Sequence, residues 1–429
     1  MRPLRYFVMA VSVLGLAGLA ACKSAHLSGG KLHFDQKRYE RAKEQFLLAK
    51  EEQPENGEVR LWLGRAYAEL GEVEKADEAF TAAKETDPEL SEQVANARQH
   101  YWTDKHNEGL KFASQGNSAR QAGNEEEARE AFEEALVEFR KATVYDPDRL
   151  ETFTFIGKLQ FQLGRTDEAI ATFREVKELA AEQIAGAADP KAAQEIEQEV
   201  DDLLAAVYWD LGDRAYQEGE WDDAIKFYKE VRAITPEDPD LLYQLAGGYF
   251  QKAIDAETPA EERTEYMRNA ANLYGQVVER VKGDEDALYN MTVALWELGE
   301  YEQGAQRAQT LVDLNPKDGE YHILLGRMLN KLGKQEEFVK EFILGKALRD
   351  GRMDPPGTDV RSEVQSYGPD TDIKDMLRMM GQPQEVRRFD YQGDQEYVVW
   401  FYWSEGKAYA FVDGAQQFEV VFEPVTQGT

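Results

Sequence analysis

Five positions of this chain return together at an interval of 34 residues near its start. They hold a glycine, an alanine, a phenylalanine, a second alanine and a proline, found first as Gly30, Ala42, Phe46, Ala49 and Pro54 and then as Gly64, Ala76, Phe80, Ala83 and Pro88. A fixed period of about 20–50 residues is typical of proteins built from stacked structural units, each of which packs on its neighbours. The chain is therefore expected to form an array of repeated units.

The period and the residues that carry it resemble the tetratricopeptide repeat (TPR), a helix–turn–helix unit. The resemblance implies a mainly α solenoid of about eight units over residues 23–350, whose inner face forms a long groove for another protein. Beyond the second unit the pattern continues with insertions. It fades after Gly345, as is typical of the last, capping repeat of a solenoid.

The third unit is longer than the period by 14 residues. These residues divide into two added turns on each helix, because seven residues are close to two helical turns and keep the apolar face in register. The turn is then predicted at Gly123-Asn124, with Ala128 and Phe132 on the core side. Farther on, Asp189-Pro190 predicts a break between two helices, since proline interrupts a helical pattern.

The pattern changes after residue 350. Residues 351–372 are rich in glycine and proline and are predicted to be a linker. Residues 373–429 are predicted to form a small α+β domain, with a helix at 373–380 and an antiparallel meander. Its strands are expected at 387–391, 396–403, 407–412 and 418–422, separated by glycine-containing turns.

This tail resembles the small SmpA/OmlA (BamE-like) domains of outer-membrane-assembly lipoproteins. The matching residues are Leu377 followed by Gly381-Gln382-Pro383, then 400–402 (Trp-Phe-Tyr), then 410–414 (Ala-Phe-Val-Asp-Gly). The strand at 396–403 is apolar on both of its faces, whereas a strand with one solvated face alternates with polar residues. One face can be covered by the helix at 373–380. The other is expected to dock either on the last repeats or on a partner.

Residues 1–22 are predicted to be a targeting segment. Arg2 and Arg5 precede an apolar stretch that is short for a permanent membrane span. The following residues 19–22 (Leu-Ala-Ala-Cys) resemble the lipobox of bacterial lipoproteins, which implies a diacylglyceryl group, with palmitate-type acyl chains, on Cys22. Lys23 after the cysteine implies sorting to the outer membrane, facing the periplasm. The alternative is an ordinary secretory signal.

The composition is strongly acidic, with 50 basic and 82 acidic residues and a net charge of −32. Nucleic acid is therefore excluded as a partner, because phosphate binding needs a basic surface. The acidity is interpreted as solvated helix faces, and the alternative is a basic or calcium-bridged partner. Cys22 is the only cysteine, and no pair of the five histidines has the spacing of a zinc helix. We expect no catalytic residues, metal, cofactor or small-molecule substrate.

The groove is the predicted binding site. In tetratricopeptide repeats the inner face is lined by positions 2, 5, 9 and 12 of each first helix. Positions 5 and 12 of four consecutive units carry aromatic residues at seven of eight places, namely Phe161, Trp209, Tyr216, Tyr243, Phe250, Tyr289 and Trp296. Aromatic side chains bury a large area at low entropic cost and often anchor interfaces. The alternative is that these rings pack sideways as core. The terminal units offer Arg65 and Arg327 instead.

Together these features predict a non-catalytic adaptor lipoprotein that holds an envelope protein through an extended or helical apolar segment. Resemblance to repeat lipoproteins implies a role in outer-membrane protein assembly, in secretin or pilus assembly, or in peptidoglycan machinery. Two alternatives stay open: a periplasmic chaperone for unfolded clients, and an enzyme with an unrecognised site.

Overall fold

The computed structural model describes residues 24–350, 360–390 and 395–424. The chain divides into two compact units, Met1–Val207 (unit 1) and Tyr208–Thr429 (unit 2). The predicted targeting segment with Cys22 lies outside the described residues, as do 351–359 of the predicted linker. In the described part of the chain, no helix combines the length and apolar character needed to cross a membrane.

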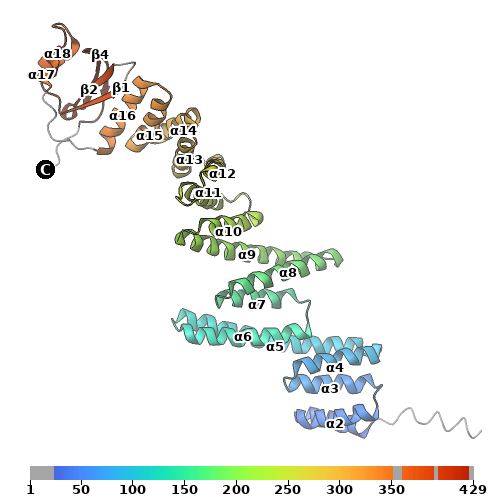
Figure 1. Cartoon of the computed structure of the whole chain (residues 1–429). Coiled ribbons are helices and arrows are strands. Elements are labelled where there is room, and N and C mark those ends of the chain that lie inside the picture. The colour runs from blue at the N-terminus through green and yellow to red at the C-terminus, as the bar shows by residue number, and fades with distance from the viewer. Residues whose placement is uncertain (1–23, 351–359, 391–394, 425–429) are drawn as a thin grey trace, which may run out of the picture. The chain divides into compact units, whose positions relative to one another are not determined.

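Unit 1 consists of helices that pack as consecutive pairs (Figure 1). The helices are α1 (Ala25–Asp35), α2 (Tyr39–Glu52), α3 (Gly57–Glu69), α4 (Val73–Thr86), the short 3₁₀ helix η1 (Pro88–Leu90), α5 (Ser91–Gln121), α6 (Glu125–Tyr145), α7 (Leu150–Gln162) and α8 (Thr166–Gly186). Helix α9 (Lys191–Glu218) carries the chain from unit 1 into unit 2. The predicted break at Asp189-Pro190 is confirmed, because it falls between α8 and α9.

The repeated glycine and the repeated aromatic residue meet inside each helix pair. A Cβ atom added to Gly64 would lie 2.7 Å from the ring of Phe80, and one added to Gly212 would lie 2.6 Å from the ring of Tyr228. Real Cβ atoms do not approach a ring this closely, so the two helices can pack in this way only with glycine. The repeated residues therefore form the same contact in successive helix pairs, with the glycine of the first helix against the aromatic ring of the second.

The lengthened third repeat contains this contact twice. Added Cβ atoms would lie 2.8 Å from Phe139 at Gly109 and 2.5 Å from Phe132 at Gly116, two turns farther along α5. Gly123 has φ of 81°, a left-handed conformation that glycine adopts without strain, and it makes the turn between α5 and α6. The two added turns are confirmed for α6, which has 21 residues against 14 in α4. Helix α5 is longer than predicted, with 31 residues against 13 in α3.

Unit 2 continues the helix pairs and ends in a sheet. After α9 come α10 (Trp221–Ile234), α11 (Pro239–Ile254), α12 (Ala260–Arg280), α13 (Glu285–Glu297), α14 (Tyr301–Leu314), α15 (Gly319–Lys331) and α16 (Gln335–Asp350), then α17 (Arg361–Val364) and α18 (Asp372–Met380). The predicted fold class, a tetratricopeptide-type solenoid followed by a small α+β domain, is confirmed.

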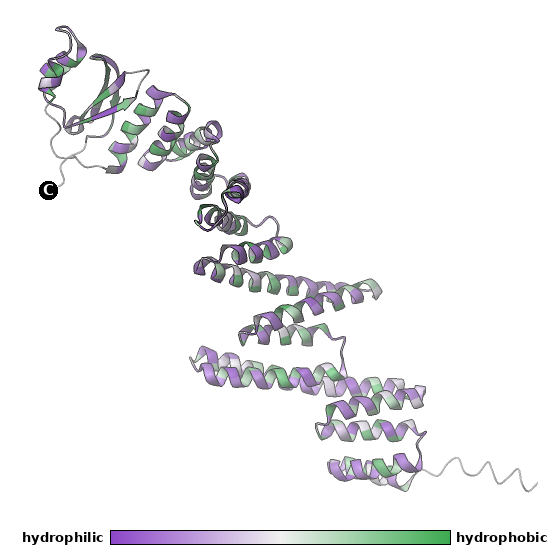
Figure 2. Ribbon diagram, in the orientation of Figure 1, coloured by the Kyte–Doolittle hydropathy of each residue, from purple (hydrophilic) through white to green (hydrophobic). Residues whose placement is uncertain are grey.

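The sheet is an antiparallel meander in the order β1-β2-β3-β4. Its strands are β1 (Glu385–Asp390), β2 (Glu396–Tyr402), β3 (Lys407–Val412) and β4 (Ala415–Val421), with the short 3₁₀ helix η2 (Trp403–Glu405) before β3. Both the helices and the strands mix hydrophilic and hydrophobic residues along their length (Figure 2). Strands β1 and β4 begin two and three residues before their predicted starts.

Helices cover both faces of the sheet. On one face, Tyr397, Val399 and Phe401 of β2 share a buried cluster with Val339 and Ile343 of α16. The last repeat helix therefore covers the sheet face whose partner the sequence left open.

On the other face, Val398, Trp400 and Tyr402 share a cluster with Ile373 and Met376 of α18, as predicted, and with Val360 and Val364. Val360 is 1% and Val364 4% exposed. Both valines lie within the predicted linker 351–372, so the packed core of the small domain includes residues of that segment.

Candidate partner-binding groove

Six of the seven predicted groove residues lie on the first helices of consecutive pairs in unit 2. We call them the aromatic row: Trp209 and Tyr216 on α9, Tyr243 and Phe250 on α11, and Tyr289 and Trp296 on α13. All six side chains are half-buried. Each ring therefore has one part packed on the solenoid and another part open to solvent.

Three tyrosines of the row connect neighbouring first helices. Tyr216 of α9 reaches α11, where a Cβ added to Gly247 would lie 3.3 Å from its hydroxyl oxygen. The Asn290 amide on α13 donates a hydrogen bond of 2.8 Å to the hydroxyl of Tyr243 on α11. Tyr289 of α13 lies with its ring centroid 6.1 Å from that of Tyr321 on α15. These contacts hold α9, α11, α13 and α15 side by side.

The row is also braced by aromatic residues on the second helices. The ring centroids of Tyr216 and Trp221, and those of Trp296 and Tyr301, are 5.2 Å and 5.3 Å apart. The first pair is edge-on and the second is tilted, and ring contacts of this kind restrict ring orientation. Phe250 has a different support, because it packs on a small apolar cluster that includes Met267. Sideways packing, the alternative interpretation of the row, therefore accounts for part of each ring, and the use of the exposed part for binding stays a prediction.

Beside the row, two acidic side chains accept hydrogen bonds from tyrosine hydroxyls. The hydroxyl of Tyr228 donates to Asp213 at 2.7 Å, and that of Tyr321 donates to Glu285 at 2.9 Å. Burial, with the hydrogen bond to the neighbouring carboxylate, raises the pKa of both phenols. Both groups therefore stay protonated donors at neutral pH, and the carboxylates beside the row stay occupied.

Phe161, the seventh predicted residue, lies on α7 in unit 1 and is half-buried. The predicted Arg65 also lies in unit 1, on α3, with its guanidinium 4.6 Å from the centroid of the Trp62 ring. Both stay predicted partner-binding residues. The lipidation site Cys22 lies outside the described residues and also stays a prediction.

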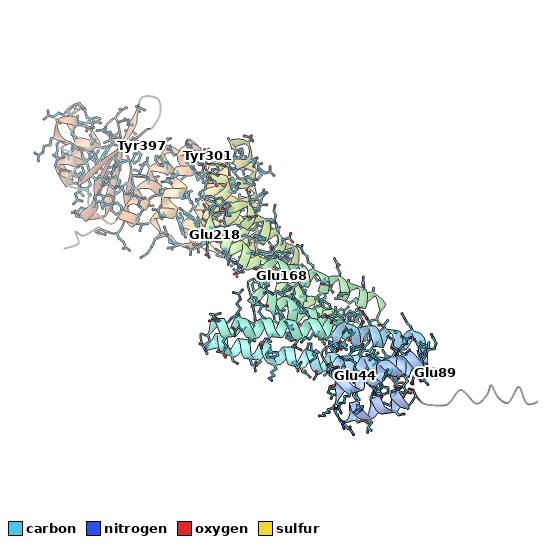
Figure 3. The ribbon with its side chains drawn as sticks, turned by 60° about the horizontal axis from the view of Figure 1, so that its bottom comes forward. Glu44, Glu89, Glu168, Glu218, Tyr301 and Tyr397 are labelled. Carbon is cyan, nitrogen blue, oxygen red and sulfur yellow. The ribbon has the colours of Figure 1, made fainter. Side chains whose placement is uncertain are left out.

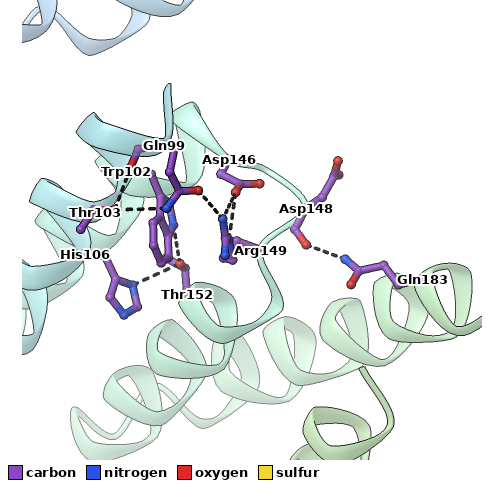
Figure 4. A network of polar contacts seen from close by, with 9 residues as sticks. All are labelled: Gln99, Trp102, Thr103, His106, Asp146, Asp148, Arg149, Thr152 and Gln183. Atoms are coloured by element: carbon purple, nitrogen blue, oxygen red, sulfur yellow. Dashed lines mark hydrogen bonds and ion pairs between the residues drawn. The ribbon is translucent and has the colours of Figure 1, made fainter. Parts of the chain in front are cut away.

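A buried polar network joins α5 to α7 in unit 1 (Figure 4). The Trp102 indole donates to the Thr152 hydroxyl at 3.1 Å, and that hydroxyl lies 3.3 Å from Nδ1 of His106. The guanidinium of Arg149 stands 4.2 Å from the Trp102 ring and pairs with Asp146. Burial lowers the pKa of His106, so its imidazole is neutral at pH 7. The network satisfies polar groups at a helix contact and is explained by packing.

A second buried histidine, His322 in unit 2, has a pKa that is raised and not lowered. His322 on α15 contacts the Glu341 carboxylate at 2.6 Å through Nδ1 and the Pro316 carbonyl at 3.0 Å through Nε2. Burial alone would lower the pKa of His322, but hydrogen bonds to Glu341 and Pro316, with the charge of Asp318 nearby, raise it. Since both partners can only accept, the ring fits best as an imidazolium that donates from both nitrogens.

The acidic residues are distributed over exposed helix faces. Glu44, Glu89 and Glu168 in unit 1 and Glu218 in unit 2 are all exposed (Figure 3). Within the described ranges, no group of three or more His, Cys, Asp or Glu side chains is placed to hold a metal ion. The exposure of these acids agrees with their interpretation as solvated surface.

Three cationic residues near the end of the row could not be predicted from the sequence. Lys346 and Arg349 on α16 and Arg387 on β1 line a pocket together with Trp296 and Arg327. Of the four cationic residues, only Arg327 lies on a first helix, so the groove positions of the repeat could identify no other cation. The other three come together through the packing of α16 against the sheet.

Comparison with known proteins identifies the repeats. Family models described as tetratricopeptide repeat match residues 27–91 and 114–193, and a further one matches residues 267–328. These models indicate no catalytic family. No curated protein matches the chain.

Among solved structures, the chain is similar to two repeat proteins. MamA of AMB-1 is 18% identical over 47% of this chain and 99% of its own, with a TM-score of 0.31. YrrB, a TPR protein with an unusual peptide-binding site, is 13% identical over 50% of this chain and 94% of its own, with a TM-score of 0.32. Residues 27–91, 114–193 and 267–328 are tetratricopeptide repeats, which supports a protein-binding scaffold as the function of this chain.

Proposed function

We propose that this chain is a non-catalytic adaptor of the bacterial envelope that holds one partner protein on the aromatic row of unit 2. The observation that carries the proposal is the arrangement of six half-buried rings on three successive first helices. Rings braced from behind lose little conformational freedom on binding, so the exposed parts can anchor a ligand at low entropic cost.

The chemistry of the row favours an extended or helical segment with apolar side chains. Each ring presents an aromatic surface, and the carboxylates of Asp213 and Glu285 are already engaged by phenols of the solenoid. Apolar residues repeated along a peptide would match rings repeated from helix to helix. The pathways we propose for such a partner are outer-membrane protein assembly, secretin or pilus assembly, and peptidoglycan machinery.

The proposed location is the periplasmic side of the outer membrane, with a lipid anchor on Cys22. The support is the lipobox-like run 19–22 followed by Lys23. Replacing Cys22 with alanine is expected to block maturation, which is visible as an unprocessed precursor on a gel. A Cys22→Ala protein that is processed like the unaltered chain would contradict lipidation.

Photo-crosslinking in cells tests the groove. A p-benzoylphenylalanine replaces Phe250, and a matched control replaces Phe227, which is also half-buried but lies on the second helix α10. The adaptor proposal predicts one dominant envelope protein crosslinked from position 250 and not from position 227. Many unrelated clients from position 250 would instead favour a chaperone. Adducts only within the chain itself would mean that the row is core.

A further inference from the structure

The sheet has two edge strands, and they differ in how well they are protected against pairing with another strand. Among the described residues, β1 and β4 lie at the two ends of the order β1-β2-β3-β4. β1 has four charged side chains in six residues, whereas β4 has one in seven. Charged side chains on an edge strand discourage a further strand from adding to it. The edge formed by β4 therefore lacks the protection that β1 has.

The single charge on β4 is already neutralised. The ammonium group of Lys407 on β3 pairs with the carboxylate of Glu419 at 2.8 Å. β4 also contains no proline, which would remove a backbone donor from the edge. Val421 at the end of the strand is apolar and 64% exposed. β4 thus has neither the charge nor the proline that commonly blocks an edge strand.

Near its end, β4 directs backbone hydrogen-bonding groups out of the sheet. Phe422, just after β4, donates its N–H to the carbonyl of Gly406 at 2.8 Å, on the β3 side. Successive residues of an antiparallel strand direct their backbone groups to opposite sides, so those of Val421 and Glu419 point away from β3. These groups can pair with one further strand.

The other end of β4 is less suited to pairing. Its ladder with β3 is irregular at Ala410 and Phe411, and the N–H of Gln416 donates to the carboxylate of Asp372 on α18 at 2.8 Å. A bulge and a donor that is already engaged both interrupt an edge. We call residues 419–421 the open edge, because no described strand pairs with their outward side.

Side chains alternate between the two faces along the open edge. Phe418, Val420 and Phe422 belong to the apolar cluster that the sheet shares with α16. Glu419 and Val421 lie on the other face and are exposed. A strand added here would therefore extend the apolar cluster on one face and meet Glu419 and Val421 on the other.

The charges of this segment favour one register for a second, antiparallel copy of β4. A pairing centred on Glu419 places the Glu419 side chains of both copies opposite each other. A pairing centred on Val421 places Glu419 opposite Glu423 of the second copy. Like charges directly opposite each other destabilise a strand pair. The register centred on Val420 avoids both conflicts, because Glu419 then faces Val421 of the second copy.

We propose that the open edge pairs with the same edge of a second copy, in an antiparallel register centred on Val420. The pairing is symmetrical, so Phe418 of each copy stands opposite Phe422 of the other, and the apolar clusters of the two sheets join. One pair of short strands is small beside the roughly 1,200–2,000 Å² that stable interfaces bury, so the dimer is expected to be weak. The inference goes beyond the proposed function and does not depend on the aromatic row.

Sedimentation equilibrium of the full chain tests the dimer. A monomer–dimer equilibrium is expected, and salt should strengthen it by screening two chains that each carry a net charge of −32. Val421→Glu should weaken the dimer at least tenfold, because symmetry places a new carboxylate opposite Glu419 twice. The control Met379→Glu makes the same charge change on α18, at a side chain that is 73% exposed, and should stay within twofold.

Disulfide trapping tests the register, in a chain that also carries Cys22→Ser. Val420→Cys should give a disulfide-linked dimer under mild oxidation, because the Cα atoms of facing residues of this kind lie about 4.5 Å apart, within disulfide reach. Glu419→Cys should give at most a tenth as much, although residue 419 is exposed and residue 420 is buried. Random collision would favour the exposed position, so the two variants separate pairing from collision.

Four results would overturn the proposal. The first is a chain that stays monomeric up to about 0.1 mM. The second is a dimer that Val421→Glu weakens no more than Met379→Glu does, and the third is equal trapping of both cysteine variants. The fourth is a monomer in which β4 gains protection from hydrogen exchange only when the protein crosslinked from position 250 is added. That result would assign the open edge to the partner and not to a second copy.

Discussion

Replacing Ile343 with alanine tests whether the sheet and the last repeat share one core. Ile343 of α16 is 0% exposed and packs in the cluster that contains Val399, Phe401 and Trp403. Truncating a fully buried isoleucine to alanine costs about 2–5 kcal/mol, through lost apolar burial and the cavity left behind. At about 1.4 kcal/mol for each factor of ten, even the lower value increases the population of open states roughly 30-fold.

Hydrogen exchange followed by mass spectrometry locates this effect. Peptides that cover β2 and β3 are expected to exchange roughly 30-fold faster in Ile343→Ala, because local opening of the sheet becomes easier. The control is Val421→Ala on β4, where the side chain is 64% exposed and little burial is lost. If exchange of β2 and β3 stayed within threefold of the unaltered protein, α16 would not be a structural part of the sheet core. That face would then be open for a partner.

Two further predictions concern close packing and pH. Gly116→Leu should lower the urea midpoint of unit 1, because overpacking against Phe132 costs about 1–3 kcal/mol of stability. The control is Gly186→Ala, whose added Cβ meets nothing within 4 Å and should leave the midpoint unchanged. Equal midpoints for the two variants would refute the close contact between Gly116 and Phe132. The raised pKa of His322 should stabilise unit 2 fully below its ordinary pKa of 6.5, with the gain lost as pH rises through the raised pKa. Urea titrations across that pH range should show this loss of stability, and the His322→Gln variant should lack the pH dependence. The same pH dependence in the unaltered protein and in His322→Gln would refute the role of His322.

Much of the repeat architecture could be predicted because it depends on contacts that are local in sequence. The approach of Gly64 to Phe80 spans 16 residues, so one helix pair contains both partners and the pattern recurs with each pair. The same logic predicted the turn at Gly123 and the added length around Phe132. In each case a short segment specifies its own packing.

What could not be predicted depends on segments far apart in the chain. Docking of the sheet on the last repeats was one of two alternatives, and the sequence could not decide between them because nothing near Ile343 or Phe401 identifies the other residue as its neighbour. For the same reason Lys346 and Arg387, both of which pair with Glu385, could not be recognised as neighbours. The contribution of Val360 and Val364 to the small-domain core was missed because the glycines and prolines of residues 351–372 are typical of a linker.

The most direct test of the proposed function is the affinity of the segment that crosslinking identifies. Titration calorimetry would compare its binding to the unaltered chain, to Phe250→Ala and to Phe227→Ala. An interface anchor costs at least about 1.4 kcal/mol when truncated, so Phe250→Ala should weaken binding tenfold or more. Phe227→Ala, on the second helix, should bind like the unaltered chain. Equal affinity of all three proteins would contradict the claim that the aromatic row holds the partner.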